Sequence, residues 1–144
     1  MSQKNFFEFN FASLKHFLIE DLDIEEKKVS MRSKQIWQSV YKKGSFEINN
    51  LTTFPLELRN KLNNLISLQK PKITNTQTSS DGTIKWLIKL FDSNEVECVY
   101  IPEKTRATLC ISSQVGCTLN CRFCHTGTQR LVKNLSFAEI VNQV

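Results

Sequence analysis

The chain has 144 residues, a formal net charge of +5 and 40% hydrophobic residues. This is the composition of a globular protein with one ordinary domain or two small ones, and it excludes a fibre and a disordered chain. No apolar run approaches the roughly 18 to 20 residues of a membrane-spanning helix, and the first residues lack the basic start and apolar core of a secretory signal. We therefore expect a cytoplasmic protein without a membrane partner.

Apolar residues recur at helical spacing in three stretches of the first two fifths of the chain, residues 14–22, 36–41 and 58–66. Ser30 or Ser33 is a candidate cap for the second helix, and Gly44 lies where a helix would stop. Pro55 suits the first turn of the third helix. We interpret residues 1–73 as a small helical accessory domain.

Basic residues are frequent in this first half. A basic face attracts polyanions through counterion release, so nucleic acid binding is one interpretation. A solvated lysine-rich surface is the other, because basic patches are common and unspecific. The residues concerned are Lys27, Lys28, Arg32, Lys34, Lys42, Lys43, Arg59, Lys61, Lys70 and Lys72.

A polar stretch over residues 74–82 is the best candidate for a linker. Apolar residues then alternate over 84–90 and over 96–100, separated by the turn-forming residues 92–94, which predicts a β-hairpin that ends at Pro102. Cys98 falls on an apolar face of this hairpin and is expected to be a small core residue. We assign residues 74–106 to the linker and hairpin.

The last segment predicts a strand over residues 107–112, a cysteine-rich loop and a helix. Ser136 and Glu139 have the spacing of a capping box, and Phe137, Ile140, Val141 and Val144 are the expected apolar positions of the helix. Strand, loop and helix make half of a repeating β/α unit, so residues 107–144 read as the start of a larger domain that is cut short. The predicted class is α+β.

The five cysteines all lie at or after Cys98. An odd number without an export signal argues against a disulfide framework and favours metal or redox chemistry. Cys117, Cys121 and Cys124 have the spacing C-x3-C-x2-C. Three thiolates can bind three irons of a [4Fe-4S] cluster and leave the fourth iron open to a small chelator such as S-adenosylmethionine.

Zinc is the alternative, because Cys110 together with these three cysteines could form a tetrahedral four-sulfur site. Structural zinc sites more often use two C-x2-C pairs, and the chain has only one. Buried, inert cysteines are the remaining alternative. His125 follows the last cysteine, where a residue that shapes the loop is more common than a ligand.

Residues 97–102 (ECVYIP), 106–110 (RATLC), 112–117 (SSQVGC) and 123–129 (FCHTGTQ) closely resemble one family. They are similar to the RlmN family of radical-SAM methyltransferases, which methylate carbon 2 of adenosine in 23S ribosomal RNA and in certain transfer RNAs. Residues 32–37 and 41–44 resemble the helical accessory domain of that family. The resemblance implies that the segment from residue 107 begins a radical-SAM partial TIM barrel.

The resemblance also implies individual roles. Cys117, Cys121 and Cys124 match the ligands of the [4Fe-4S] cluster, and Phe123 matches an aromatic residue beside the adenine of S-adenosylmethionine. Cys110 matches a cysteine that forms a transient disulfide with a methyl-carrying cysteine, and Glu97 matches a proton acceptor. From spacing alone, Cys110 reads as a buried strand thiol and Glu97 as a solvent-facing glutamate.

The family further implies an RNA substrate and an external electron donor. The methyl-carrying cysteine and most of the barrel have no counterpart in these 144 residues. We therefore expect an N-terminal portion that is inactive alone, with a separate chain as one possible source of the missing barrel. A non-catalytic RNA-binding remnant and a structural zinc protein are the alternatives.

Overall fold

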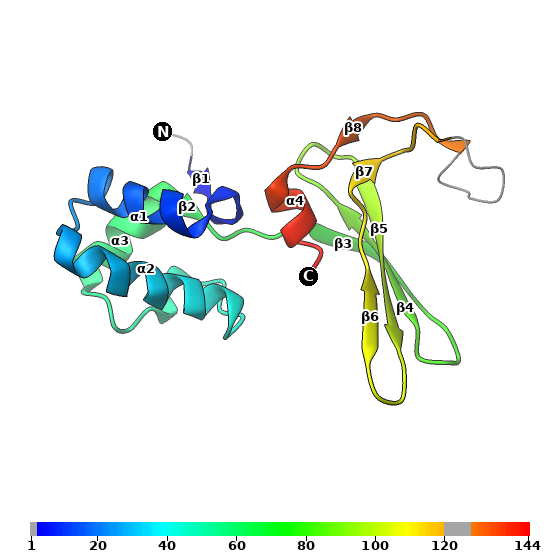
Figure 1. Ribbon diagram of the computed structural model, residues 1–144, viewed down its shortest axis with the longest axis horizontal. Coiled ribbons are helices and arrows are strands. Elements are labelled where there is room, and N and C mark those ends of the chain that lie inside the picture. Colours follow the sequence, from blue (N-terminus) through cyan, green and yellow to red (C-terminus); the bar gives the residue numbers. More distant parts are fainter. Residues whose placement is uncertain (1–2, 120–127) are drawn as a thin grey trace. The chain divides into compact units, whose positions relative to one another are not determined.

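The computed structural model describes residues 3–119 and 128–144. The chain divides into two compact units, Met1–Gln69 and Lys70–Val144, which we name the helical unit and the sheet unit (Figure 1). The first is built mainly from helices and the second around an antiparallel sheet. The mixed helix-and-sheet class predicted from the sequence is therefore confirmed.

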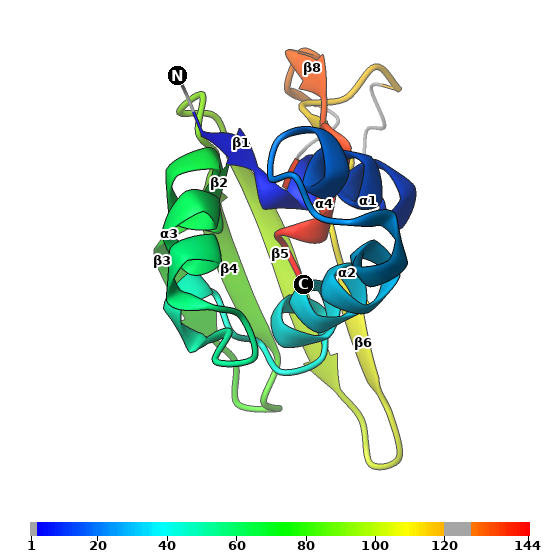
Figure 2. The same cartoon turned by 90° about the vertical axis from the view of Figure 1, so that its left-hand side faces the viewer.

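The helical unit contains the three helices that the apolar periodicity predicts. They are α1 (Phe11–Glu20), α2 (Glu26–Tyr41) and α3 (Leu56–Leu65). The 3-10 turns η1 (Phe6–Glu8) and η2 (Ile48–Asn50) precede α1 and α3, and β1 (Lys4–Asn5) pairs in parallel with β2 (Ile66–Ser67). Figure 2 shows these helices around one interior. Its most buried apolar residues are Phe6, Leu14, Leu18 and Leu62.

Helix α2 begins earlier than predicted. Its cap is Glu25, so the assignment of Ser30 or Ser33 as the cap is wrong. Ser33 lies fully buried inside the helix, and its hydroxyl donates to the carbonyl oxygen of Val29 at 2.8 Å. A serine whose hydroxyl bonds to the carbonyl oxygen four residues earlier can lie inside a helix and does not have to cap its end. The predicted stop at Gly44 is confirmed by its φ of +61°, a left-handed conformation that favours glycine.

The sheet unit is organised around four antiparallel strands in the order β3-β4-β5-β6. They are β3 (Lys72–Thr78), β4 (Ile84–Lys89), β5 (Glu95–Pro102) and β6 (Ala107–Cys110). Strands β4 and β5 form the predicted hairpin, with Trp86 opposite Cys98 and Ile88 opposite Val96. The alternation of apolar residues therefore correctly predicted which face of the hairpin is buried.

The linker expected over residues 74–82 is wrong for residues 74–78, which belong to strand β3. Every residue of β3 is exposed, because the strand lies at the edge of the sheet. An edge strand with two polar faces carries no hydrophobic alternation, so its sequence resembles a loop. The strand shifts register near Thr74, whose hydroxyl lies 2.8 Å from the Glu95 carboxylate.

The short strands β7 (Gln114–Val115) and β8 (Lys133–Asn134) pair with each other, and α4 (Phe137–Val141) follows them. Ser136 and Glu139 form the predicted capping box at the start of α4. Phe137 and Val144 are 59% and 76% exposed, so their expected places on the apolar face are wrong, and Ala138 is buried instead. A helix of five residues is too short to bury a full stripe.

The core of the sheet unit lies on one face of the hairpin. Ile88, Leu90, Val96, Cys98 and Leu135 form a buried cluster, against which Ile140 of α4 also packs. Cys98 is fully buried, which confirms its interpretation as a small core residue. The opposite face of the hairpin, from which Glu95 and Glu97 project, is left open to solvent.

The end of β6 is held by a side chain from the C-terminal segment. The Gln143 amide accepts a hydrogen bond from the Ser112 backbone N–H and donates one to the Ser112 carbonyl oxygen, both at 2.8 Å. Gln143 is buried. One side chain therefore makes the pair of hydrogen bonds that a neighbouring strand would make at Ser112.

Strand β6 pairs antiparallel with β5, and Cys110 lies opposite Val99. The role of this strand as the first strand of a barrel remains a prediction. Within residues 3–119 and 128–144, no helix has the length and apolar character needed to cross a bilayer.

Candidate functional site

Two residues predicted to act in catalysis, Glu97 and Cys110, line the same cavity. The cavity has a volume of about 450 Å³, which is in the range of small-molecule sites. Glu97 comes from β5 and Cys110 from β6, next to each other on the open face of the sheet. Gly116 and Gln129, on either side of the cysteine loop, line the same cavity. The sheet and the loop thus contribute to one site.

The side chain of Glu97 is oriented by a neighbour across the hairpin. Its carboxylate lies 3.0 Å from the Lys85 ammonium, and its backbone carbonyl accepts a hydrogen bond from the Ser112 hydroxyl at 2.8 Å. Both side chains of the ion pair are substantially exposed, so the pair contributes more to orientation than to stability. The carboxylate can accept a proton from a molecule bound in the cavity.

One cysteine of the loop, Cys117, and the strand cysteine Cys110 are within the described residues, and both are free thiols. Cys110 is exposed and Cys117 is partly buried, so the interpretation of Cys110 as a buried strand thiol is wrong. The Leu119 backbone N–H donates to the Cys117 sulfur at 3.4 Å. Amide donors to sulfur are a usual feature of cysteine ligands in iron–sulfur sites. Cys121, Phe123, Cys124 and His125 lie outside the described residues.

Metal binding by the cysteines remains a prediction. Among the described residues, no three His, Cys, Asp or Glu side chains gather as a metal site. The cluster site and the zinc site both require Cys121 and Cys124. The donor set of thiolates and the N–H···S hydrogen bond at Cys117 fit an iron–sulfur cluster.

The two arms of the cysteine loop close into a neck, which we define as residues 113–117 and 129–135. The Cys117 N–H donates to the Gln129 carbonyl at 3.1 Å, the Val132 N–H to Val115 at 2.8 Å and the Leu135 N–H to Ser113 at 2.9 Å. Gly116 has a φ of +75° at this crossing. A glycine directly before a cysteine that is predicted to bind the cluster is a usable sequence signal for such a crossing.

A second feature that sequence reasoning missed is a cluster of three charges beside the neck. The Lys133 ammonium contacts the Asp92 carboxylate and lies 2.6 Å from Glu139. This ammonium lowers the pKa of Asp92 to about 2, assisted by hydrogen bonds from Asn94. In turn, hydrogen bonds to Asp92 and Glu139 raise the pKa of Lys133. No local sequence pattern predicts this cluster, because Asp92 and Lys133 are 41 residues apart in the chain.

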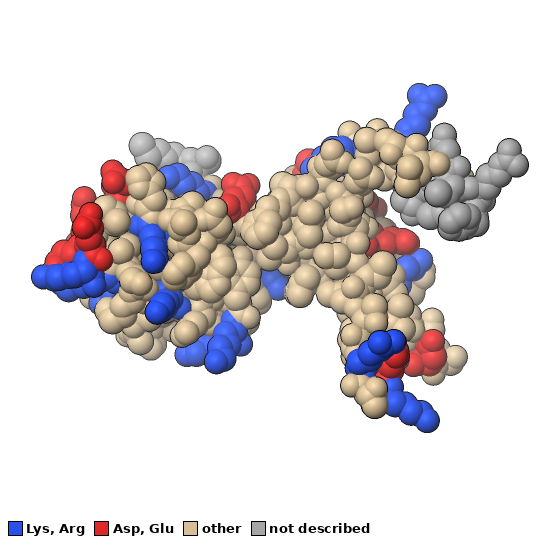
Figure 3. All heavy atoms as spheres, viewed as in Figure 1, with Lys and Arg blue, Asp and Glu red and all other residues tan. Residues whose placement is uncertain are grey.

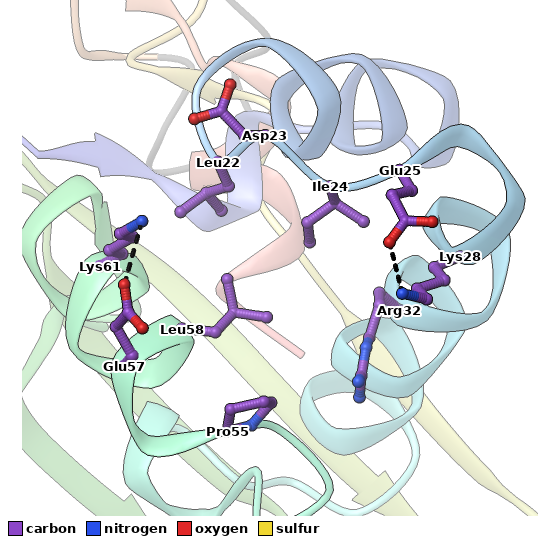
Figure 4. A pocket seen from close by; sticks show the side chains of 10 residues that line it. All are labelled: Leu22, Asp23, Ile24, Glu25, Lys28, Arg32, Pro55, Glu57, Leu58 and Lys61. Carbon is purple, nitrogen blue, oxygen red and sulfur yellow. Dashed lines mark hydrogen bonds and ion pairs between the residues drawn. The ribbon is translucent and has the colours of Figure 1, made fainter.

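The helical unit has a smaller cavity, of about 260 Å³, lined by charges of both signs (Figure 4). Lys28 pairs with Glu25 at 2.5 Å and Lys61 with Glu57 at 3.4 Å. Residues 1–69 contain ten basic and eight acidic residues, and Figure 3 shows both kinds interspersed on this unit. Its excess of positive charge is therefore smaller than its lysines alone suggest.

The fold and the site correspond to a known class of enzyme. A solved structure of a radical SAM methyltransferase from Sphaerobacter thermophilus matches 96% of this chain with a TM-score of 0.83 and 30% sequence identity, and the match covers 40% of that chain. No protein-family model matches the sequence. The chain thus has the fold of part of a radical SAM methyltransferase.

Curated relatives narrow this class. The chain is 47% identical over 130 residues to the dual-specificity RNA methyltransferase RlmN of Bradyrhizobium sp. strain ORS 278, and 50% identical over 120 residues to RlmN of Rhodopseudomonas palustris strain BisA53. These matches cover 86% and 79% of this chain but only 32% and 30% of the relatives. The predicted resemblance is confirmed: the sequence is similar to part of these RlmN proteins, and it spans about a third of the length of the curated relatives it matches.

Proposed function

We propose that this chain contributes the cluster-binding loop and part of the active site of an RlmN-type enzyme, which methylates carbon 2 of adenosine in 23S ribosomal RNA and transfer RNA. The observation that carries the proposal is the cavity shared by Glu97, Cys110 and the two arms of the cysteine loop. A proton acceptor and a thiol beside a cofactor loop are the groups that this reaction needs. RNA is accordingly the proposed substrate.

Cys117, Cys121 and Cys124 would hold a [4Fe-4S] cluster, with S-adenosylmethionine at its open iron and Phe123 beside the adenine. When bound, this pair supplies the radical chemistry needed at a carbon that ordinary methyl transfer does not reach. The N–H···S hydrogen bond from Leu119 supports Cys117 as a ligand, because such bonds are common at cluster cysteines. Reduction of the cluster requires an external electron donor.

The side chains of this chain have simpler tasks. Glu97, held by Lys85 at 3.0 Å, accepts the proton that carbon 2 of the adenine loses when the methyl group is added. Cys110 is a free, exposed thiol, as required of a cysteine that forms a disulfide with the methyl-carrying cysteine. That second cysteine would come from outside these 144 residues.

The remaining assignments follow from the same proposal. Residues 1–73 serve as the accessory domain, residues 74–106 include the hairpin, and residues 107–144 begin the partial TIM barrel. The basic residues of the accessory domain contact RNA phosphates, which position a substrate without reading its sequence. The rest of the barrel comes from further polypeptide, for which a separate chain is one source, and the enzyme acts in the cytoplasm.

The test is anaerobic reconstitution of the 144-residue chain with iron and sulfide, followed by absorbance and EPR spectroscopy. A four-iron signal that changes when S-adenosylmethionine is added supports the proposal, with Cys117→Ala as the variant that should lose it. Zinc in place of iron would instead identify a structural metal protein. A chain without metal that binds RNA with a steep salt dependence would be an RNA-binding remnant. The isolated chain is expected to give no methyl transfer.

A further inference from the structure

We propose that Lys133 is a positioning residue that holds the neck closed, because it attaches the outgoing arm of the neck to the hairpin and to α4. This inference rests on the proposed function, because the loop matters as the place of the cluster ligands. Lys133 does not line the cavity described above, and among the described residues its ammonium pairs with Asp92 and Glu139, so its role is indirect.

The neck has few attachments of its own: Val115 and Leu135 reach the core cluster, and the Gln114 amide donates to the Asn134 side chain at 2.7 Å. Strands β7 and β8 have two residues each, and an isolated two-stranded ribbon is marginally stable in water even when it is longer. The crossing at Gly116 and Arg130 brings backbone against backbone, which adds no side-chain packing there. Beyond β8, Leu135 is anchored in the core cluster, but residues 129–134 lie outside that core.

Lys133 supplies the missing attachment. Its ammonium contacts Asp92, in the turn between β4 and β5, and lies 2.6 Å from Glu139 in the first turn of α4. Glu139 uses its other carboxylate oxygen to accept from the Ser136 N–H at 2.8 Å. The Asp92 carboxylate is also held, because it accepts from the Asn94 N–H at 3.1 Å. One ammonium therefore joins the neck to two elements whose own positions are already fixed.

The burial of these groups makes the attachment stronger than an ordinary surface pair. The side chains of Lys133 and Glu139 are only 30% and 14% exposed. An isolated, exposed ion pair contributes little to stability, whereas a network of charges with defined geometry contributes more. Asp92 and Glu139 around the Lys133 ammonium form such a network. A lysine in place of either carboxylate would have no negatively charged partner there.

The test compares the wild-type chain with Lys133→Met, Lys133→Arg and a control, Lys89→Met. Methionine keeps an unbranched apolar chain, arginine keeps the charge and can still reach two carboxylates, and Lys89 is an exposed lysine of β4. Amide hydrogen exchange is measured by NMR at Cys117 and Val132, whose N–H groups close the neck. Exchange at Ile88 and Val96 reports on the core.

In Lys133→Met, exchange at the two neck amides should become faster by a factor of about 5 to 30, which is the effect of losing one or two kcal/mol. The core amides should keep their rates, and Lys133→Arg and Lys89→Met should behave as the wild type. Unchanged neck amides, or a rise of the same factor in the core, would overturn the proposal.

A cofactor readout separates positioning from simple stability. After reconstitution, Lys133→Met should lose the change in the EPR signal that S-adenosylmethionine causes in the wild type, and Lys133→Arg should keep it. A normal EPR response in Lys133→Met, despite faster exchange in the neck, would overturn the positioning role. If the wild type takes up no cluster, the proposed function fails for this chain, and the exchange rates still decide whether Lys133 closes the neck.

Discussion

The backbones of Gly116 and Arg130 approach so closely that a β-carbon at Gly116 would lie 2.0 Å from the carbonyl oxygen of Arg130. This crossing occurs immediately before Cys117 and closes the neck of the cysteine loop. Cys117, the first of the proposed cluster ligands, therefore follows a contact that only glycine permits. Four predictions follow from this crossing and from other contacts of the two units.

Gly116→Ala should destabilise the sheet unit strongly. The left-handed φ costs an alanine about 1 to 2 kcal/mol, and overlap with Arg130 adds about 1 to 3 kcal/mol. Gly44→Ala is the matched control, because Gly44 has a similar φ of +61° with nothing within 4 Å of the added carbon. Urea unfolding of both variants measures the difference. Equal losses of stability would show that the close approach does not constrain the neck.

Cys98 and Cys110 should differ sharply in reactivity. Cys98 is fully buried, and this burial, with a smaller effect of Cys110, raises the pKa of the Cys98 thiol. Alkylation of Cys98 is slow because a raised pKa leaves less of it as thiolate and because the reagent cannot reach a buried sulfur. Cys110, in contrast, is exposed. A short pulse of iodoacetamide followed by peptide mass spectrometry should label Cys110 and spare Cys98. Comparable labelling of both thiols would contradict the burial of Cys98.

Ser136→Ala should destabilise the chain by about 1 kcal/mol, the usual effect of removing a helix cap. The hydroxyl of Ser136 accepts from the Glu139 N–H at 3.2 Å, and alanine leaves that donor without its partner. Ser30→Ala is the control, since Ser30 lies exposed within α2 and alanine favours helix there. Thermal unfolding should show a loss for the first variant and none for the second. A loss of stability in Ser30→Ala would instead indicate that Ser30 caps a helix.

Asp92 should stabilise the folded chain in a pH-dependent manner. Its folded pKa of about 2 lies below the ordinary value of 3.8, so the stabilisation is complete above the ordinary value and disappears as the pH falls toward 2. The stability difference between the wild type and Asp92→Asn, measured by urea unfolding, should therefore shrink over that interval. Added salt should reduce it at every pH, because the carboxylate is accessible to ions. A difference that stayed constant across this range would contradict the ion pair with Lys133.

The sequence predicted those parts of the fold that depend on local patterns. Helical spacing located α1, α2 and α3, and alternation located the hairpin with Cys98 inside it. Strand β3 was mistaken for a linker because both of its faces are exposed. A strand without a buried face has no periodic signal, and its pairing with β4 is set by the partner strand.

The same distinction applies to the site. Cys117 and Glu97 were identified from the cysteine spacing and the family resemblance, because their types and positions in the chain are informative. Lys133 and Gln143 were not identified. Lys133 meets Asp92 across 41 residues and Gln143 meets Ser112 across 31, and such contacts exist only once the chain is folded. Groups that support a site through distant partners leave no local pattern in one sequence.

The hydrogen bonds between Gln143 and Ser112 also constrain the order of folding during synthesis. Because Gln143 lies 31 residues downstream of Ser112, the end of β6 stays unfixed until the ribosome has released nearly the whole of this segment. The hairpin closes over a few residues and can form much earlier, since short loops close quickly. A nascent chain would therefore form its hairpin while the end of β6 was still without the hydrogen bonds that Gln143 makes to Ser112.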